Sequence, residues 1–297
     1  MIVSICPTFL CNQRCEYCFL GNLRNDKHYL DCSLLKNKLN IINDLDKITS
    51  INIFGGEVSL LSKDYLNRLN NVCKSFTDNI TVTTNFHNQY IVDVFDNISF
   101  SYNEERPDYE RIKQLLPYYE KEYSLSIVVL PSIIKANVKE LLDSINYYNC
   151  KNITFQKYSP ALLANNNYQI SDEEYMKTLI NIIDYYLDNA NQYYFNVSNV
   201  KDIANCLRND YNPKMDANIF INHQGQYGYI KYDKNNLEFY EWCDTIDAYK
   251  DACNVEKQHY QNCMNCQYFN RCYAEHLNFN VSCCGHKELL KHYEGRL

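Results

Sequence analysis

Short runs of β-forming residues alternate with helical patterns over the first two thirds of the chain, and this alternation limits the possible folds more than any other feature. Six runs favour strands: IVSIC (2–6), INIF (51–54), ITVTT (80–84), ISFSY (98–102), LSIVVL (125–130) and ITFQKY (153–158). Strands that alternate with helices every 20 to 30 residues or so, roughly counted, indicate βαβ units and a parallel sheet. Six units are too few for a closed eight-stranded barrel. The sequence therefore predicts an α/β protein with a partial barrel or a doubly wound sheet.

Amphipathic helices are predicted between these strands, because apolar residues recur at helical spacing on one face. Three such faces are Leu34, Leu35, Leu39, Ile42 and Leu45; Leu66, Leu69, Val72, Cys73 and Phe76; and Val138, Leu141, Leu142 and Ile145. Ser171 and Glu174 form a capping-box pattern that predicts the start of a further long helix.

The pattern changes near residue 210. The segment NHQGQYGYIKYDKNN (222–236) predicts a hairpin with glycine at its turns, and a cysteine-rich segment follows it. A boundary between residues 200 and 216 gives two predicted domains, 1–205 and 206–297.

The charge balance narrows the class of partner. The chain of 297 residues has 29 basic and 36 acidic residues, a net charge of −7, which argues against a partner that needs a basic surface, such as nucleic acid or an anionic membrane. No window approaches the roughly 20 apolar residues of a membrane span. The N-terminus lacks the pattern of a signal peptide, so we expect a cytoplasmic protein.

The spacing of the cysteines predicts their role better than their number, which is 15. An odd count without an export signal makes a complete disulfide framework improbable. Three cysteines lie within residues 11–18 and seven more within residues 243–284. The scattered ones are expected to be small buried residues, as free cysteine commonly is: Cys6, Cys32, Cys73, Cys150 and Cys206.

Cys11, Cys15 and Cys18 have the spacing C-x3-C-x2-C directly after the first predicted strand. The carboxyl end of a strand in an α/β sheet is where active-site groups lie. Thiolates at this spacing can converge on one soft metal centre. A structural zinc ion takes four protein ligands. A [4Fe-4S] cluster held by three cysteines instead leaves one iron open to a non-protein ligand.

These residues resemble the signature of radical S-adenosylmethionine (radical SAM) enzymes, which have C-x3-C-x-aromatic-C after the first strand, with Tyr17 here as the aromatic residue. The sequence Gly55-Gly56-Glu57 after the second strand is the second mark of that family. Asn85 after the third strand and Ser101 at the end of the fourth are weaker marks. The resemblance covers about residues 1 to 200 and implies a partial (β/α)6 TIM-like barrel.

The resemblance also implies a cofactor site. Three cysteines would ligate a catalytic [4Fe-4S] cluster, and the methionyl amine and carboxylate of S-adenosylmethionine would bind its fourth iron. The expected cluster ligands are Cys11, Cys15 and Cys18. Residues expected near S-adenosylmethionine are Tyr17 at the adenine, Gly55, Gly56 and Glu57 at the methionyl group, and Asn85 and Ser101 at the ribose or carboxylate. The alternative is a zinc-binding or metal-free loop.

The C-terminal cysteines resemble the SPASM extension of many radical SAM enzymes, which binds auxiliary [4Fe-4S] clusters. The expected ligands of one auxiliary cluster are Cys263, Cys266, Cys272 and Cys283, with Cys284 in place of Cys283 as an alternative. Two further ligand positions of the SPASM pattern are occupied by Ile230 and His276, so one auxiliary cluster is expected. A second cluster from Cys243, Cys253 and His276, or a zinc ribbon in the tail, remains an alternative.

Three functions are compatible with these features. The first is modification of a peptide by a crosslink, epimerisation or oxidation, after hydrogen abstraction by a 5′-deoxyadenosyl radical. The second is dehydrogenation or epimerisation of a small molecule in natural-product or sugar metabolism. The third, a non-catalytic iron–sulfur or zinc module, is disfavoured by the intact N-terminal motif. The cluster motif begins at residue 11, so we expect no N-terminal leader-binding domain. This expectation weakens the peptide hypothesis, which stays the preferred one because a separate peptide-binding protein could hold the substrate.

No catalytic acid, base or hydrogen donor is identified from the sequence. Cys150 and Cys206 are candidate thiol donors, and positions at the ends of the sixth and fourth strands are candidate substrate contacts: Gln156, Lys157, Tyr158 and Glu104. The expected electron donor is a flavodoxin or a ferredoxin.

Overall fold

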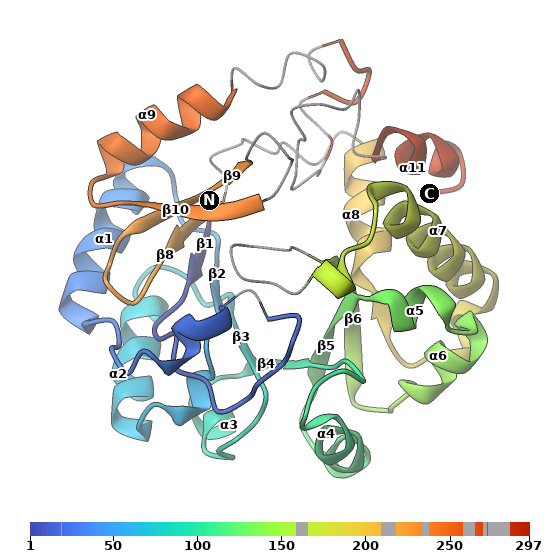
Figure 1. Cartoon of the computed structure of the whole chain (residues 1–297), viewed down its shortest axis with the longest axis horizontal. Helices are drawn as coiled ribbons and strands as arrows, with labels where there is room; N and C mark the ends of the chain where they lie inside the picture. The colour runs from blue at the N-terminus through green and yellow to red at the C-terminus, as the bar shows by residue number, and fades with distance from the viewer. Residues whose placement is uncertain are drawn as a thin grey trace.

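The computed structural model describes residues 1–18, 20–158, 166–208, 218–232, 238–257, 265–269, 272 and 286–297. Its ten strands form one open sheet in the order β10-β9-β8-β1-β2-β3-β4-β5-β6-β7 (Figure 1). The strands are β1 (Ile2–Ile5), β2 (Ser50–Ile53), β3 (Ile80–Thr84), β4 (Asn97–Ser101), β5 (Tyr123–Val129), β6 (Cys150–Lys157), β7 (Asn196–Val197), β8 (Asn218–Ile221), β9 (Tyr227–Tyr232) and β10 (Glu238–Cys243). All six predicted strands are present.

Strands β8 and β1 to β7 are parallel, and β9 and β10 complete the sheet in antiparallel pairs. Helices cover the outer face of this curved sheet, as Figure 1 shows. The sheet does not close, so the fold is a partial TIM-like barrel, and the predicted fold class is confirmed.

The helices between the strands are those that the apolar periodicity predicted, with several short ones added. They are α1 (Cys32–Leu45), α2 (Lys63–Lys74), α3 (Ile91–Val94), α4 (Tyr109–Leu115), α5 (Pro131–Lys135), α6 (Val138–Ser144), α7 (Asp172–Asn189), α8 (Ser198–Leu207), α9 (Ile246–Lys257) and α11 (His286–Tyr293). The predicted capping box is confirmed: the Ser171 hydroxyl accepts a hydrogen bond from Glu174 N, and the Glu174 carboxylate accepts one from Ser171 N. A side-chain cap at each of Asp31, Ser62 and Asn137 fixes the start of α1, α2 and α6 in the same way.

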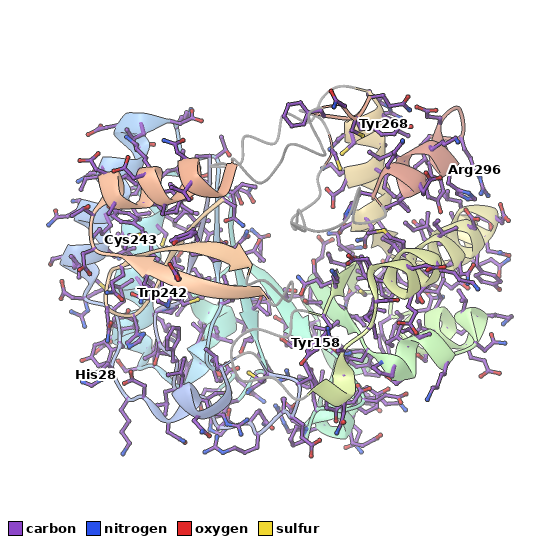
Figure 2. All side chains as sticks on the ribbon, turned by 45° about the horizontal axis from the view of Figure 1, so that its top comes forward. His28, Tyr158, Trp242, Cys243, Tyr268 and Arg296 are labelled. Carbon is purple, nitrogen blue, oxygen red and sulfur yellow. The ribbon has the colours of Figure 1, made fainter. Side chains whose placement is uncertain are left out.

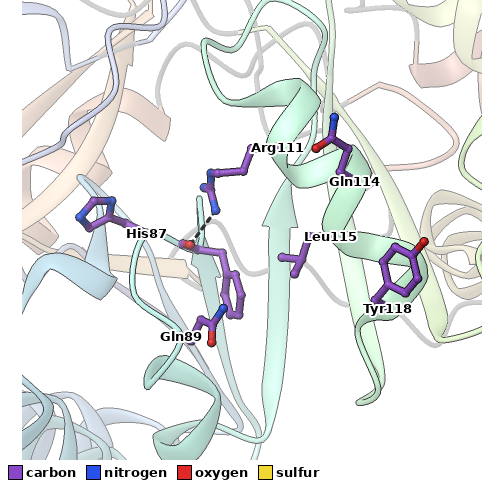
Figure 3. Close-up of a pocket in the computed structure, with 7 residues that line it drawn as sticks. His87, Gln89, Arg111, Gln114, Leu115 and Tyr118 are labelled. Atoms are coloured by element: carbon purple, nitrogen blue, oxygen red, sulfur yellow. Dashed lines mark hydrogen bonds between the residues drawn. The ribbon is translucent and has the colours of Figure 1, made fainter.

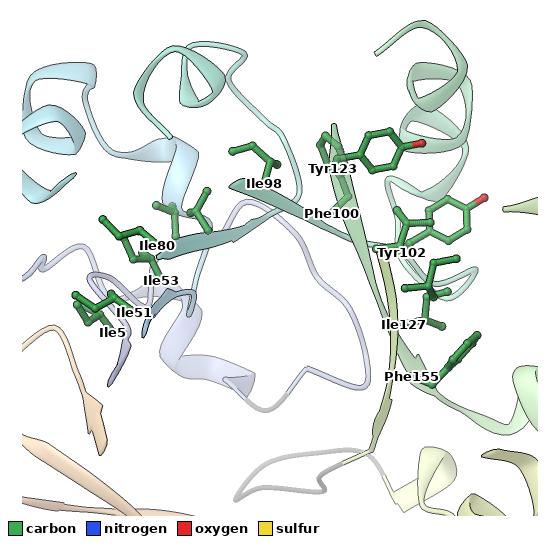
Figure 4. Packing of buried hydrophobic residues seen from close by; sticks show 14 of the residues in the cluster. Ile5, Ile51, Ile53, Ile80, Ile98, Phe100, Tyr102, Tyr123, Ile127 and Phe155 are labelled. Carbon is green, nitrogen blue, oxygen red and sulfur yellow. The ribbon is translucent and has the colours of Figure 1, made fainter. Parts of the chain in front are cut away.

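The two faces of the sheet differ in composition, because side chains alternate between them along each strand. Isoleucine, valine and phenylalanine side chains on the outer face are buried under the helices and form the main core (Figure 4). Burial of each such side chain stabilises the fold by about 1.5 to 3 kcal/mol. The inner face has short polar side chains, which are mostly half-exposed: Asn52, Thr81, Thr83, Ser101, Ser124, Ser126 and Thr154.

Strand β8 extends the barrel sheet beyond β1. Its register pairs Ile2 with Asn218 and Ile5 with Ile221, and Cys6 N donates a hydrogen bond to Ile221 O (2.8 Å). The predicted hairpin follows, with its turn at Gly225, whose φ of +76° lies in the left-handed region that favours glycine. The sheet is therefore continuous across the predicted boundary at residue 205.

The antiparallel strands β8, β9 and β10 lie against the start of the chain. The ring centroid of Phe9 is 4.4 Å from that of the buried His223 and 6.4 Å from that of Trp242. Trp242 is the single tryptophan of the chain, and it packs beside Phe9 with Cys6, Cys18 and Leu20. The hairpin thus covers one side of the segment that carries the first three cysteines.

The scattered cysteines are buried as expected, with the exception of Cys32, which is partly exposed. In the part of the chain that the structure describes, no helix has the length and hydropathy to cross a membrane.

Candidate active site

The segment between β1 and α1, residues 6–31, carries the three predicted cluster ligands at the carboxyl end of β1. Two backbone hydrogen bonds close it into a compact loop: Leu30 N donates to Pro7 O (2.8 Å) and Cys11 N donates to Arg24 O (3.0 Å). Cys15 is buried, whereas Cys11 and Cys18 are partly exposed. We call residues 6–31 the cysteine loop.

The three thiols are close enough to affect one another. Burial, above all, raises the pKa of Cys11 to about 11; a hydrogen bond from Gln13 N lowers this pKa, while negative charge on Glu57, Cys18 and Cys15 raises it. Burial also raises the pKa of Cys15, and the neighbouring Arg106 charge opposes that rise. Thiolates in such a setting are stabilised by a cationic metal centre, so the donor set fits a soft metal cluster.

Among the residues described, no three His, Cys, Asp or Glu side chains are gathered as closely as a bound metal ion requires. The chemistry of the three thiols and their position in the fold therefore support a cluster, whereas the distances between the side chains do not.

The Gly-Gly-Glu segment after β2 is joined to the cysteine loop through its backbone. Gly56 N donates to Thr8 O (2.9 Å) and Glu57 N donates to Leu10 O (2.7 Å). A Cβ atom on Gly56 would lie 2.6 Å from the carbonyl carbon of Phe9 and closer still to the Leu10 carbonyl oxygen. The resemblance implied that these glycines admit the methionyl group of a cofactor. In the structure, the lack of a side chain at both positions lets the backbone of the cysteine loop approach closely. The approach of a methionyl group stays a prediction.

Glu57 connects the cysteine loop to the end of β3. Its carboxylate is 2% exposed and accepts hydrogen bonds from Ser59 N (2.8 Å), Asn85 N (2.6 Å) and the Thr84 hydroxyl. The Glu57 carboxylate thus fixes the position of Asn85. The predicted contact of the Gly-Gly-Glu segment with the methionyl group stays a prediction.

Replacing Glu57 with Gln should destabilise the protein by about 2 kcal/mol, because one carboxylate acceptor becomes an N–H donor that faces another donor. We expect a lower urea midpoint with an unchanged slope. The matched control is Glu110→Gln, on the exposed side of α4, which should leave the midpoint unchanged. Equal midpoints for the two variants would show that the Glu57 carboxylate is not needed for this connection.

Asn85 presents an unused acceptor beside the cysteine loop. Its Nδ2 donates to Asn12 Oδ1 (2.9 Å), and Asn12 Nδ2 in turn donates to His87 Nδ1 (3.0 Å). The Oδ1 atom of Asn85 is buried and accepts no hydrogen bond from the described residues. An unpaired buried acceptor is costly unless a ligand supplies the donor. Asn85 therefore fits a ligand that carries N–H or O–H groups, as the methionyl ammonium and the ribose of S-adenosylmethionine do.

The backbone next to Asn85 is strained. Phe86 has a φ of +58°, in the left-handed region that a phenylalanine rarely adopts. Arg111 holds this conformation, because its guanidinium donates to the carbonyl oxygens of Phe86 (3.0 Å) and Asn85 (2.5 Å). Strain of this kind is typical of functional positions.

A pocket of about 390 Å³ opens on the outer side of this turn (Figure 3). It is lined by Phe86, His87, Gln89, Arg111, Gln114, Leu115 and Tyr118. Because His87 is linked to Asn12, the pocket adjoins the cysteine loop.

Aromatic residues surround Cys15 on the opposite side of the loop. Tyr17, Leu130 and Tyr158 are buried together with Cys15 in one apolar cluster. The ring of Tyr168 lies 6.0 Å from that of Tyr17, edge to face. Tyr158 lies near the middle of the molecule in Figure 2. This cluster provides an apolar environment next to the predicted cluster ligands, as an adenine ring prefers.

The other predicted contact residues have different positions. Ser101 ends β4, in register with Ser126 of β5. Lys157 forms an ion pair with Asp172 at the start of α7, whereas Gln156 and Glu104 are exposed.

Three further charged residues of this region were not predicted from the sequence. Asp108, whose side chain is 5% exposed, forms ion pairs with Arg106 (3.1 Å) and Arg111 (3.3 Å). The signal that could have identified them is the run of four charged residues within positions 106–111, shortly after the predicted strand that ends at Tyr102.

The predicted auxiliary cluster is described only in part. Cys266 and Cys272 pack, partly buried, against the core on either side of the buried Tyr268, whose hydroxyl donates to Glu294 (2.6 Å; Figure 2). Cys263, Cys283, Cys284 and His276 lie outside the described residues. Cys253 is buried on α9, and Cys243 ends β10.

No protein-family model and no curated protein matches the chain. Solved structures do match. The chain is 17% identical to native anSMEcpe with bound AdoMet, with a TM-score of 0.69 over 99% of this chain and 97% of that one. It is 17% identical to Streptococcus suis SuiB bound to S-adenosylmethionine, with a TM-score of 0.61 over 91% of this chain and 71% of that one.

Two similar structures contain a peptide. They are SuiB bound to its precursor peptide SuiA (16% identity, TM-score 0.64, 95% of this chain and 75% of that one) and anSMEcpe with AdoMet and the Cp18Cys peptide (16%, 0.69, 99% and 97%). The neighbours are radical SAM enzymes, so the resemblance predicted from the sequence is confirmed at the level of the fold.

Proposed function

We propose that this protein is a radical SAM enzyme that modifies a peptide. One observation carries the proposal: the three-cysteine loop stands at the carboxyl end of β1, and the Gly-Gly-Glu segment is hydrogen-bonded to its backbone, within a fold shared with AdoMet-bound structures. The position and the residues of the site both favour this activity.

The residues of the site suit the two groups that such an enzyme binds. Cys11, Cys15 and Cys18 would hold a [4Fe-4S] cluster. The Asn85 Oδ1 atom would accept a hydrogen bond from S-adenosylmethionine, and the cluster of Tyr17, Leu130 and Tyr158 would shield its adenine from water. When bound, these groups supply reductive cleavage of S-adenosylmethionine to a 5′-deoxyadenosyl radical, which takes a hydrogen atom from the substrate. The protein's contribution is to position the reactants and exclude water.

The inner face of the sheet supports a substrate site in front of this centre. It presents hydroxyl and amide side chains from consecutive strands, and Ser4 Oγ donates to Asn218 Oδ1 (2.9 Å) across β1 and β8. Such groups can pair with the main chain of an extended peptide. The peptide-bound similar structures favour the same substrate class over a small molecule.

We assign one auxiliary [4Fe-4S] cluster to Cys263, Cys266, Cys272 and Cys283 in the second proposed domain, 206–297. Two of these ligands, Cys266 and Cys272, lie at the surface of the core. An auxiliary cluster there would accept the electron that the substrate radical loses when it is oxidised to the product. A flavodoxin or ferredoxin would supply the first electron, and a separate peptide-binding protein would present the substrate.

The test is anaerobic reconstitution with iron and sulfide, followed by incubation with dithionite and S-adenosylmethionine. We expect formation of 5′-deoxyadenosine, and acceleration by short peptides encoded near the gene that change mass in the reaction. A protein that binds iron and leaves S-adenosylmethionine intact under these conditions would contradict the proposal. Turnover of a small molecule in place of every peptide would overturn the substrate class alone.

A further inference from the structure

Glu105 has a carboxylate oxygen that accepts no hydrogen bond from the residues that the structure describes. Its Oε1 accepts a hydrogen bond from the Ser132 hydroxyl (2.5 Å), in the first turn of α5, whereas its Oε2 is buried and has no hydrogen-bond partner. Burial of a carboxylate oxygen without a hydrogen-bond donor is unfavourable. A group held in this way calls for a ligand or for a structural explanation.

The position of Glu105 is at the mouth of the proposed site. It follows the end of β4 by four residues. Its hydrogen-bond partner Ser132 is two residues after Leu130, which is buried in one apolar cluster with Cys15 and Tyr17. Glu105 is therefore close to the aromatic cluster around Cys15.

The next residue does not neutralise Glu105. The Arg106 side chain is 11% exposed and pairs with Asp108 at 3.1 Å. The other cations described at this end of the sheet also have partners. Arg111 forms an ion pair with Asp108, and Lys157 forms one with Asp172. Arg14 and Arg24 donate hydrogen bonds to carbonyl oxygens of the cysteine loop. This end of the sheet thus offers an unpaired anionic oxygen, while each of these cations already has a partner.

The charge pattern selects among substrates. A phosphate or a carboxylate on the substrate would meet the neutral inner face and the Glu105 charge, which repels it. An ammonium or a guanidinium would meet a partly buried carboxylate that Ser132 orients, and would form charge-assisted hydrogen bonds with it.

We propose that Glu105 binds a cationic group of the substrate: a lysine or arginine side chain, or the terminal ammonium, of a peptide. This inference rests on the proposed function, because it places the reacting part of the substrate on the inner face next to the cysteine loop. Ser132 is a positioning residue, which turns Oε2 towards the bound cation.

The hydroxyl and ammonium groups of S-adenosylmethionine are the other donors that can reach this end of the sheet. The two sources differ in what the loss of the Glu105 charge would affect. If the donor belongs to the substrate, the affinity for S-adenosylmethionine stays constant and the preference for a cation disappears.

The experiment measures binding of three capped amino acids to the reconstituted protein with S-adenosylmethionine, by isothermal titration calorimetry. The probes are N-acetyl-lysine, N-acetyl-norleucine and N-acetyl-glutamate methylamides. We expect wild type to prefer the lysine probe over norleucine by about tenfold or more, and Glu105→Gln to lose that preference. The matched control, Glu110→Gln on exposed α4, should keep it, and thermal unfolding should verify that both variants are folded.

Three results would overturn the inference: equal affinity of wild type for the lysine and norleucine probes, an undiminished lysine preference in Glu105→Gln, or a weaker affinity of that variant for S-adenosylmethionine without a change in lysine preference. The readout is binding, so it is independent of turnover. A wild type that selects lysine through Glu105 but forms no 5′-deoxyadenosine would refute the proposed function and leave the cation site standing.

Discussion

Replacing Cys11, Cys15 and Cys18 together with alanine should remove about four irons per chain after anaerobic reconstitution and abolish formation of 5′-deoxyadenosine. The reason is that the three thiols are the donors that the cysteine loop offers, and no other protein ligand is expected for this cluster. The measurement is iron and sulfide per chain, with electron paramagnetic resonance of the reduced protein. About four irons should remain, bound by the C-terminal cysteines.

The control for this experiment is a triple variant in which three buried cysteines outside the site, Cys73, Cys150 and Cys206, are replaced with alanine. It should keep about eight irons, the content expected of wild type with two clusters. Iron content that is equal in the two triple variants would refute the assignment of the cysteine loop. One zinc ion in place of the remaining irons would make the tail a zinc site.

Replacing Gly56 with alanine should destabilise the protein by about 3 kcal/mol and also lower the iron content. The added Cβ atom would meet backbone atoms of Phe9 and Leu10, which cannot rotate away as a side chain does. Relief requires the cysteine loop to move away from β2, which would break the hydrogen bonds from Gly56 N and Glu57 N. Urea unfolding of the iron-free protein measures the first effect, and iron analysis the second.

Gly295→Ala is the matched control. Gly295 has a φ of +78° and nothing within 4 Å of an added Cβ atom. Its cost is therefore only that of a left-handed alanine, about 1 kcal/mol. Gly56→Ala that unfolds at the same urea concentration as Gly295→Ala, with full iron content, would show that the close approach to the cysteine loop is unimportant.

Much of the fold could be predicted because its signals are local. The six strands and the capping box at Ser171 depend on residues a few positions apart, and they were found with small errors at the ends. The parallel pairing of β8 with β1 joins Ile5 to Ile221, and no short-range pattern encodes a contact over that separation. The same holds for the hairpin that brings Trp242 to Phe9.

The candidate site was predictable as a set of positions and less so as a set of roles. The motif glycines were identified, but their closeness to the backbone at Phe9 and Leu10 depends on how two loops meet. The hydrogen bonds of the Glu57 carboxylate with Thr84 and Asn85 could not be predicted, because they depend on how the ends of β2 and β3 meet. The unpaired oxygens of Asn85 and Glu105 exist only in the folded protein, because which donor is missing depends on every neighbour of the group.

The pairing of β1 with β8 has a consequence for how the chain is made. β1 occupies residues 2–5, and its second partner strand, β8, ends at Ile221. Synthesis of the intervening residues on the ribosome takes on the order of tens of seconds, so β1 lacks this partner for that time. During this interval one edge of β1 has unpaired backbone groups, and the hairpin that will cover Phe9 has not been synthesised. The cysteine loop is then most accessible to iron delivery. Insertion of the cluster is expected to compete with closure of the sheet, and the nascent chain is expected to need protection from aggregation until β8 arrives.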